Sequence, residues 1–329
     1  MGKKTNIIVL ISCLAGGIAI GGGSGFLLGH FLKPPTVNLD DIDLDDIEDK
    51  NGSMIEKYNS IVEQGKDPLE ELEIYEMANL ALEKYQSHKY AVALGYGEAR
   101  SAVNLSILNC TIKNDDTYFE ESLSKSFPGS IMNIIVAQRD IQFGHEDNSH
   151  VDSYLGTIEG DDIKNATFVN AEKLDYDVTS YKKKFGKSVD STNVYVISSK
   201  TVLTETVTEI DINGNEKIGQ SRVEKTESGI KLFLDLHTTY SVVKYYKRMV
   251  NLSNSNVSMF NYVHVTYNLD NEFNLISSHI EENYVAGMGN IKATVNGTMD
   301  TYYFVDQERP ILTDLAQKIN YPEKGVLYE

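Results

Sequence analysis

The stretch "NYVHVTYNLDNEFNLISSHIEENYV", residues 261–285, decides the fold. On both sides of its "LDNEFNL" centre, apolar and aromatic residues alternate with polar ones. Such alternation predicts half-buried strands, and the Asp-Asn pair at 270–271 predicts the turn that joins them. We therefore expect an antiparallel hairpin here. The run "IKATVNGTMDTYYFV" at 291–305 extends it to a three-stranded meander.

The same two-residue period recurs upstream, from about residue 90 onward. The expected strands, rich in Val, Ile, Thr, Tyr and Phe, are "YAVALGYG", "VNLSILNCTI", "IMNIIVAQRDIQF", "NVYVIS", "TVLTETVTEIDI" and "GIKLFLDL". Asn213-Gly214 is a strong hairpin signal and predicts a tight turn. This part of the chain therefore predicts a large antiparallel sheet.

Helical patterns are few and lie mainly before the strands. The segment Ile55–Gln86 has helical spacing, and Asp67 with Pro68 predicts the N-cap and first position of its second part. Short helices are also expected at 175–185 and 240–250. The core-facing stripe of the long segment is Leu69, Leu72, Met77, Leu80, Ala81 and Tyr85. The predicted fold class is α+β, with helices packed on a large curved antiparallel sheet.

The N-terminal region predicts a membrane anchor. Ile7–Leu32 contains no Lys, Arg, Asp or Glu, and a helix of that length spans about 39 Å. Such a helix is long enough to cross the hydrocarbon core of a bilayer, which is about 30 Å thick. The run is too long for a cleavable signal peptide, so an uncleaved signal anchor is expected. Lys3 and Lys4 place the N-terminus in the cytoplasm and the rest of the chain outside.

Glycines recur at every fourth position inside the predicted span. Gly17, Gly21, Gly25 and Gly29 form a ridge of small residues on which two helix backbones can approach closely. The ridge favours a homo-oligomer or docking on a partner helix, while a plain anchor that tolerates glycine is the alternative.

Composition sets the remaining boundaries. The expected organisation is a cytoplasmic tail at 1–6, a transmembrane anchor at 7–32, an acidic flexible linker at 33–53, an extracytoplasmic domain at 54–310, and a C-terminal tail at 311–329. The chain contains two stretches in which helices are followed by strands, so a domain of two lobes, split near 150–172, is an open alternative.

The formal net charge of −18 argues against nucleic-acid binding. Cys110 is the only cysteine outside the predicted span, so no intramolecular disulfide is expected in the domain.

Few motifs with catalytic or metal-binding chemistry are present. "HEDNSH" at 145–150 is one residue too long for the H-E-x-x-H zinc motif. In a loop, however, its side chains can still converge on a metal, and the alternative is a polar surface turn. These candidate ligands are His145, Glu146, Asp147, His150 and Asp152. Because no catalytic motif has the required spacing, we expect a non-enzyme without a cofactor.

A helix followed by a curled meander, from about Leu69 to Val305, resembles the LolA and LppX-like lipoprotein carriers. The closing run "YNLDNEFNLISSHIEENYV…IKATVNGTMDTYYF" is also similar to uncharacterised membrane-anchored envelope proteins of low-GC Gram-positive bacteria. The resemblance implies a module that binds a lipid-like ligand, since those folds often hold an acyl chain in a concave sheet face. It carries no diagnostic motif and therefore assigns no functional residue.

The sequence thus predicts a single-pass membrane protein that displays a non-catalytic binding module outside the cell. Its ligand would be an apolar, lipid-like molecule or an envelope partner protein. The first alternative is a structural or assembly component of the envelope that oligomerises through the glycine ridge. A more distant alternative is a metal-dependent hydrolase that uses the cluster between His145 and Asp152.

Overall fold

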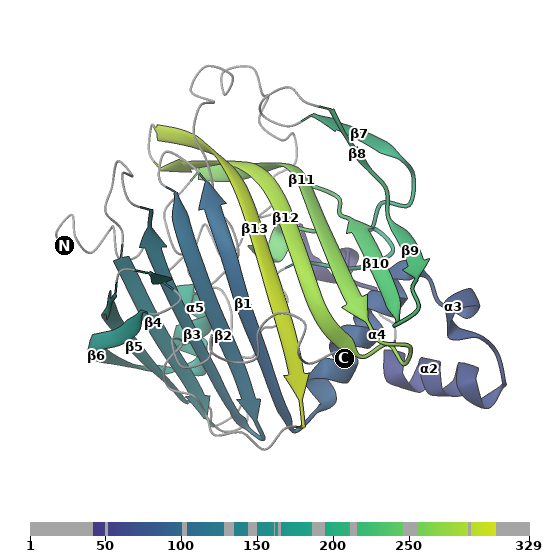
Figure 1. The fold of residues 1–329 in the computed structure, drawn as a ribbon, viewed down its shortest axis with the longest axis horizontal. Helices are drawn as coiled ribbons and strands as arrows, with labels where there is room; N and C mark the ends of the chain where they lie inside the picture. Colours follow the sequence, from purple (N-terminus) through teal and green to yellow (C-terminus); the bar gives the residue numbers. More distant parts are fainter. Residues whose placement is uncertain are drawn as a thin grey trace.

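A computed structural model describes eleven ranges of the chain: 42–49, 52–100, 104–127, 135–143, 150–160, 162–163, 166–185, 195–210, 216–245, 256–288 and 291–306. Its main feature is one eleven-stranded antiparallel sheet, with helices on one side of it (Figure 1). The strand order is β6-β5-β4-β3-β2-β1-β13-β12-β11-β10-β9. The expected α+β class with a large antiparallel sheet is confirmed.

The sheet consists of two meanders that are joined along one strand pair. The first contains β1 (Tyr90–Arg100), β2 (Leu105–Asn114), β3 (Thr117–Ser126), β4 (Ile135–Phe143), β5 (His150–Glu159) and β6 (Thr167–Asp177). The second contains β9 (Arg222–Lys225), β10 (Ile230–Asp235), β11 (Asn256–Leu269), β12 (Leu275–Met288) and β13 (Ile291–Val305). β1 pairs with β13, so strands nearly 200 residues apart in sequence meet in the middle of the sheet (Figure 1).

The meander of the opening stretch is confirmed in detail. β11 pairs with β12, and β12 pairs with β13, all antiparallel. In the turn between β11 and β12, Asp270 Oδ1 accepts hydrogen bonds from the backbone N–H groups of Glu272 and Asn274, both at 2.8 Å. An aspartate that bonds to the following backbone favours a tight turn. The predicted hairpin at Asn213-Gly214 is flanked by two paired strands, β7 (Val207–Ile210) and β8 (Glu216–Gly219).

The helices begin where capping residues predict. α2 is Met54–Glu63, α3 is Pro68–Glu71 and α4 is Ile74–Ser87. The Asp67 side chain accepts from the Leu69 N–H, and Pro68 occupies the first helical position, as predicted. The second helical segment is divided, because Leu72 is extended and a capping box at Glu73 starts α4 anew.

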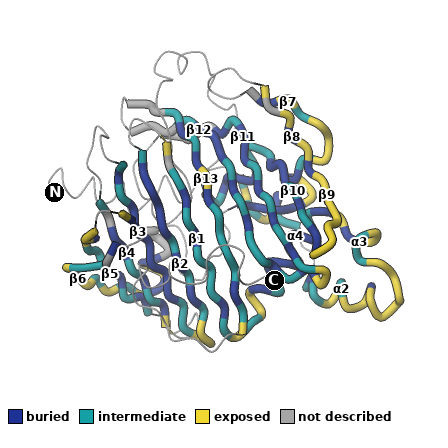
Figure 2. Tube along the Cα trace, viewed as in Figure 1, coloured by how far each residue is buried: buried dark blue, intermediate teal, exposed yellow. Residues whose placement is uncertain are grey.

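α4 supplies most of the helical contribution to the core. It packs on β10 and β12. Its buried side chains, which include most of the predicted stripe, are Ile74, Glu76, Met77, Ala78, Leu80, Ala81, Leu82 and Tyr85. The main core cluster continues across β10 to β13 and reaches Ala91 of β1 and Ile107 of β2. In Figure 2, buried residues recur along the central strands of the sheet, whereas exposed residues are frequent on β9, α2 and α3.

The opposite face of the sheet carries a second core. Leu108, Cys110 and Ile112 of β2 lie there with Phe119 and Leu123 of β3. Successive residues of a strand point to opposite faces, so these side chains face away from α4. Cys110 is fully buried and forms no disulfide.

Strands β3, β5, β6 and β9 are not among the predicted strands, and several predicted segments differ from the expectation. "NVYVIS" is not a strand in its described part, residues 195–198. The Val196 N–H donates to the Ser241 carbonyl at 2.8 Å, and the Val196 carbonyl accepts from the Thr201 hydroxyl at 2.7 Å, so these backbone groups bond to a loop and a side chain. The helix expected at 175–185 is α5 (Val178–Phe185), since Asp175 and the two residues after it pair with β5. Of the helix expected at 240–250, only residues 243–245 are helical within the described part of the chain.

Part of the acidic segment is folded onto the domain. Residues 42–49 contain a short 3₁₀ helix, η3 (Leu44–Asp46), followed by the buried Ile47. Ile47 packs with Val196 and Val243, and Glu48 forms an ion pair with Lys244. Residues 42–49 of the predicted flexible linker are therefore packed against the domain.

In the ranges that the structure describes, no helix is long and apolar enough to cross a membrane. The predicted span at 7–32 lies outside those ranges, together with Gly17, Gly21, Gly25 and Gly29.

Candidate functional site

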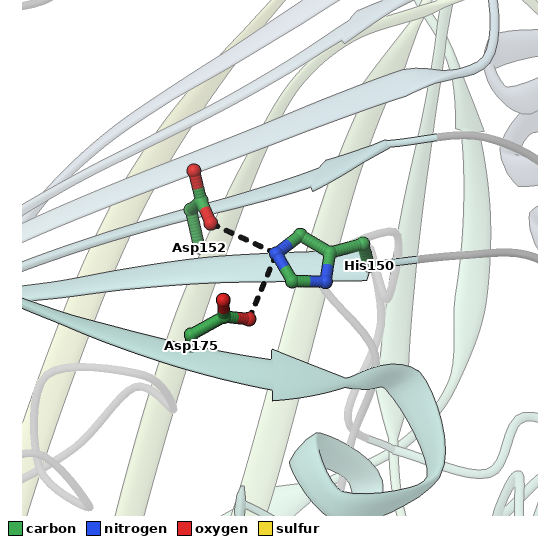
Figure 3. Close-up of side chains that lie close together, drawn as sticks. All are labelled: His150, Asp152 and Asp175. Carbon is green, nitrogen blue, oxygen red and sulfur yellow. Dashed lines mark hydrogen bonds and ion pairs between the residues drawn. The ribbon is translucent and has the colours of Figure 1, made fainter.

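Two of the five predicted metal ligands are described, and they are neighbours. His150 and Asp152 lie two residues apart at the start of β5, so both side chains point to the same face. The His150 ring nitrogen Nε2 is 3.0 Å from Asp152 Oδ1 and 2.9 Å from Asp175 Oδ1 of β6 (Figure 3). His145, Glu146 and Asp147 lie outside the described residues.

This cluster, which we call the β5–β6 cluster, already contains a cationic side chain. Lys173 Nζ is 2.8 Å from Asp152 Oδ2. Burial raises the pKa of Asp152, but hydrogen bonds from Lys173 and His150 outweigh burial and leave that pKa below its ordinary value. The Asp175 side chain is 67% exposed. The arrangement is that of an exposed ion-pair network.

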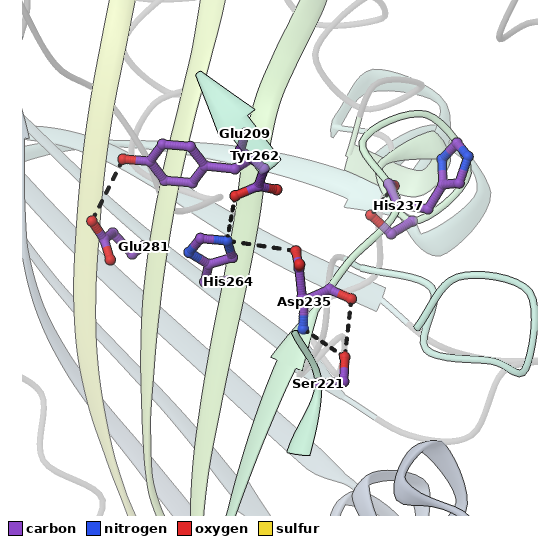
Figure 4. Close-up of polar contacts among 8 residues, drawn as sticks. Glu209, Ser221, Asp235, His237, Tyr262, His264 and Glu281 are labelled. Atoms are coloured by element: carbon purple, nitrogen blue, oxygen red, sulfur yellow. Dashed lines mark hydrogen bonds and ion pairs between the residues drawn. The ribbon is translucent and has the colours of Figure 1, made fainter. Parts of the chain in front are cut away.

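A second His–carboxylate cluster is more deeply buried. It consists of Glu209 of β7, Asp235 of β10 and His264 of β11 (Figure 4). His264 Nε2 is 2.8 Å from Glu209 Oε2 and 3.5 Å from Asp235 Oδ1. The side chains of Glu209 and Asp235 are only 7% and 3% exposed. We call these three residues the hairpin cluster, because Glu209 comes from the β7–β8 hairpin.

The surroundings of the hairpin cluster fix its geometry. Asp235 and His264 are directly opposite each other in the β10–β11 ladder. The Tyr262 ring stacks on the His264 ring, with centroids 4.8 Å apart and planes 13° apart. The Asp235 N–H donates to Ser221 Oγ at 2.9 Å, which ties this end of β10 to the segment before β9.

The hairpin backbone also lies against Asp235. A Cβ atom at Gly219 of β8 would come within 1.8 Å of Asp235 Oδ2. Glycine is therefore the residue that this close approach requires. The carboxylates of Glu209 and Asp235 thus lie between the main sheet and a hairpin whose position they help to define.

His237 and His279 do not converge with His264. His279 of β12 pairs with Asp300 of β13 at 3.0 Å. His237, after β10, accepts from the backbone N–H of Thr239, and burial lowers its pKa. In Figure 4, His237 points away from His264. The three histidines therefore have separate partners.

A buried acid lies in the aromatic part of the main core. Glu282 of β12 is fully buried and accepts a hydrogen bond from the Tyr195 hydroxyl. Burial raises the pKa of Glu282 to about 8, against the smaller lowering effect of the Tyr195 hydrogen bond. Within the described part of the chain, Glu282 Oε1 has no hydrogen-bond partner. Its neighbour Glu281 points to the other face and accepts from Tyr262, as strand alternation predicts.

A row of large side chains on β1 forms an apolar surface in the middle of the sheet. Tyr90, Val92, Leu94 and Tyr96, which we call the β1 strip, alternate along the strand and are each only partly buried. Ala91 between them faces α4, so the strip lies on the face opposite that helix. It spans about 20 Å, from the rise of 3.2–3.4 Å per residue in a strand.

We compared the chain with known protein families and curated proteins. No protein-family model matches the chain, and no curated protein matches it. The fold and its sites define the class: an α+β protein built on one large antiparallel sheet.

Sequence reasoning found half of the β5–β6 cluster and none of the hairpin cluster. His150 and Asp152 are close in sequence, whereas Glu209, Asp235 and His264 are spread over 56 residues. A hairpin signal at Asn213-Gly214 was visible, but where that hairpin docks depends on the tertiary structure.

Proposed function

We propose that the protein is a non-catalytic binding module that is held at the outer surface of a membrane by its N-terminal segment. Its ligand is a lipid-like molecule that lies along the β1 strip. The observation that carries the proposal is this row of four partly buried apolar side chains in the middle of a sheet. Contiguous apolar surface of this kind on a folded domain marks ligand or partner sites.

The surroundings of the strip support an elongated apolar ligand. On the β13 side, Val92 is opposite Phe304 and Leu94 is opposite Tyr302. On the β2 side, Leu94 is opposite the buried Cys110. Apolar and aromatic side chains thus flank the strip on both sides. Tyrosine offers an apolar ring and a polar hydroxyl, so Tyr90 and Tyr96 at the two ends suit a ligand with a polar headgroup.

The membrane location rests on the sequence of the first 32 residues. An uncharged run from Ile7 to Leu32 is long enough to span a bilayer. Protease treatment of intact cells that express the chain with a tag after Glu329 tests this part. Removal of the tag is expected, and a tag that stays protected until the cells are lysed contradicts the topology.

Photolabelling tests the ligand. The full chain, in membranes, is incubated with a photoreactive long-chain fatty acid, irradiated and digested. We expect labelled peptides from residues 90–96, and labelling that falls at least about tenfold in the variants Leu94→Gln and Tyr96→Gln. A tenfold loss corresponds to about 1.4 kcal/mol of binding free energy.

The matched control is Ile218→Gln. Ile218 is 73% exposed on the β7–β8 hairpin, away from the strip. This control should label like the unchanged chain. Labelling that is absent from residues 90–96, or that is equal in all variants, contradicts the proposed ligand site.

A further inference from the structure

The described side chains of the β7–β8 hairpin give little apolar contact with the domain. Among its described side chains, Glu209 is buried, Val207 is half-buried and Ile218 is 73% exposed. A two-stranded ribbon is marginally stable by itself. The described contacts that attach it to the main sheet are polar: Glu209 to His264, and the Gly219 backbone against Asp235.

The side chains of the hairpin cluster are types that ligate metal ions. Two carboxylates that are more than 90% buried surround one imidazole. Each of the three residues offers one ligand atom, a carboxylate oxygen or the imidazole nitrogen Nε2. Buried carboxylates are typically paired or coordinate metals.

The geometry fits a small divalent ion. One ligand atom from each residue can be chosen so that all three lie within 4.8 Å of one another. Around tetrahedral Zn²⁺, with bonds of about 2.0–2.1 Å, ligand atoms lie roughly 3.3 Å apart. The distances from His264 Nε2, 2.8 Å to Glu209 and 3.5 Å to Asp235, are on either side of that spacing.

The donor set narrows the choice of metal. An imidazole nitrogen suits zinc and other first-row transition ions, whereas calcium and magnesium prefer oxygen ligands. Tyr262 stacked on the ring of His264 fixes the orientation of the imidazole, as groups around a metal ligand commonly do.

We propose that Glu209, Asp235 and His264 bind one divalent transition-metal ion of the Zn²⁺ type, which fastens the β7–β8 hairpin to the edge of the main sheet. The site is structural. It is independent of the β1 strip, so lipid labelling and metal binding can succeed or fail separately.

Zinc titration of the full chain tests the proposal. The purified protein is stripped with chelator and titrated with Zn²⁺ in a calorimeter, and its bound metal is measured by mass spectrometry. We expect one zinc per chain at this site. In His264→Ala the affinity should fall by more than the roughly 10–100-fold that follows loss of an outer-shell partner.

Three further variants separate a metal site from a folding defect. Glu209→Gln and Asp235→Asn keep the side-chain shape and should also weaken binding, while His150→Ala in the β5–β6 cluster should leave this affinity unchanged. In the unchanged chain, zinc should slow hydrogen exchange of the β7 and β8 amides. The proposal is overturned if the chain binds no zinc, if binding survives in Glu209→Gln, or if His150→Ala removes it.

Discussion

The helix-covered face of the sheet has two halves of opposite character. Under α4, the side chains of β10 to β13 form an apolar and aromatic core with Leu232, Val263 and Tyr284 at its centre. On β3 to β5 the same face is polar, and we call this part the polar face. Besides Val151, its buried side chains are Glu120, Ser122, Ser124, Ser126, Gln138, Asp140, Gln142 and Ser153.

Hydrogen bonds replace apolar contact on the polar face. Asp140 accepts from Gln138 at 2.7 Å and from the hydroxyl of Tyr181, on α5, at 2.9 Å. Asn109 donates to Glu120 and Ser122 from the adjacent strand. Because a buried polar group costs free energy unless it is bonded, the two halves should respond differently to the same kind of substitution.

The largest effect is expected in the apolar half. Leu232→Ala removes a fully buried side chain of β10 and should lower the free energy of unfolding by about 2–5 kcal/mol. Urea unfolding of the full chain, followed by circular dichroism, measures it. The control Val223→Ala, at a partly exposed position on β9, should change stability by less than about 0.5 kcal/mol. Equal effects would contradict a packed apolar half.

Glu282 should make the apolar half sensitive to pH. Its pKa is about 8 in the folded protein against an ordinary 4.5, so the unfolded chain releases this proton first. Below about pH 4.5, the protonated group contributes its full stabilising free energy. This contribution is lost as the pH rises through 8. The loss is up to about 1.4 kcal/mol for each unit by which the folded and unfolded pKa values differ.

Urea unfolding between pH 4 and pH 9 tests this. In Glu282→Gln this loss should disappear, and the variant should be more stable than the unchanged chain at pH 9. Because the Tyr195 hydrogen bond lowers the pKa of Glu282, Tyr195→Phe should move the loss to higher pH. Identical pH profiles for all three proteins would contradict the assignment.

A hydroxyl deletion should matter more on the polar face. Tyr181→Phe removes the bond to the Asp140 carboxylate, and bonds to charged groups contribute about 1.5–3 kcal/mol. Tyr245→Phe in the apolar half removes a bond to the neutral Tyr284 hydroxyl, for which about 0.5–1.5 kcal/mol is expected. Thermal unfolding of both variants checks the order, and the reverse order would refute it.

The smallest effect is expected at Ser124. Its Oγ is buried and, within the described part of the chain, has no hydrogen-bond partner. Ser124→Ala should therefore be neutral or stabilising by up to about 1 kcal/mol, since it removes an unsatisfied group. Ser153→Ala, at a position with the same property, is the parallel variant. A loss of stability in both would show that these hydroxyls bind something on the polar face.

Local signals predicted much of the fold. Asp67-Pro68 predicted a helix start, Asn213-Gly214 a hairpin and Asp270-Asn271 a turn, because each depends on backbone preferences of a few adjacent residues. The expectation failed at 175–177, where pairing with β5 extends the strand. It also failed at "NVYVIS", where the Val196 backbone bonds to the Ser241 carbonyl and the Thr201 hydroxyl.

The sequence alone determined the elements that follow from local periodicity: the meander, the α4 stripe, and the uncharged N-terminal run that predicts a membrane anchor. The tertiary structure decided that both faces of β3 and β4 are buried, that β1 lies beside β13, and that Glu209 meets His264. The physical reason is the range of the interactions. Alternation and capping act within a few residues, whereas the burial of a strand face and the meeting of distant carboxylates depend on what packs against them.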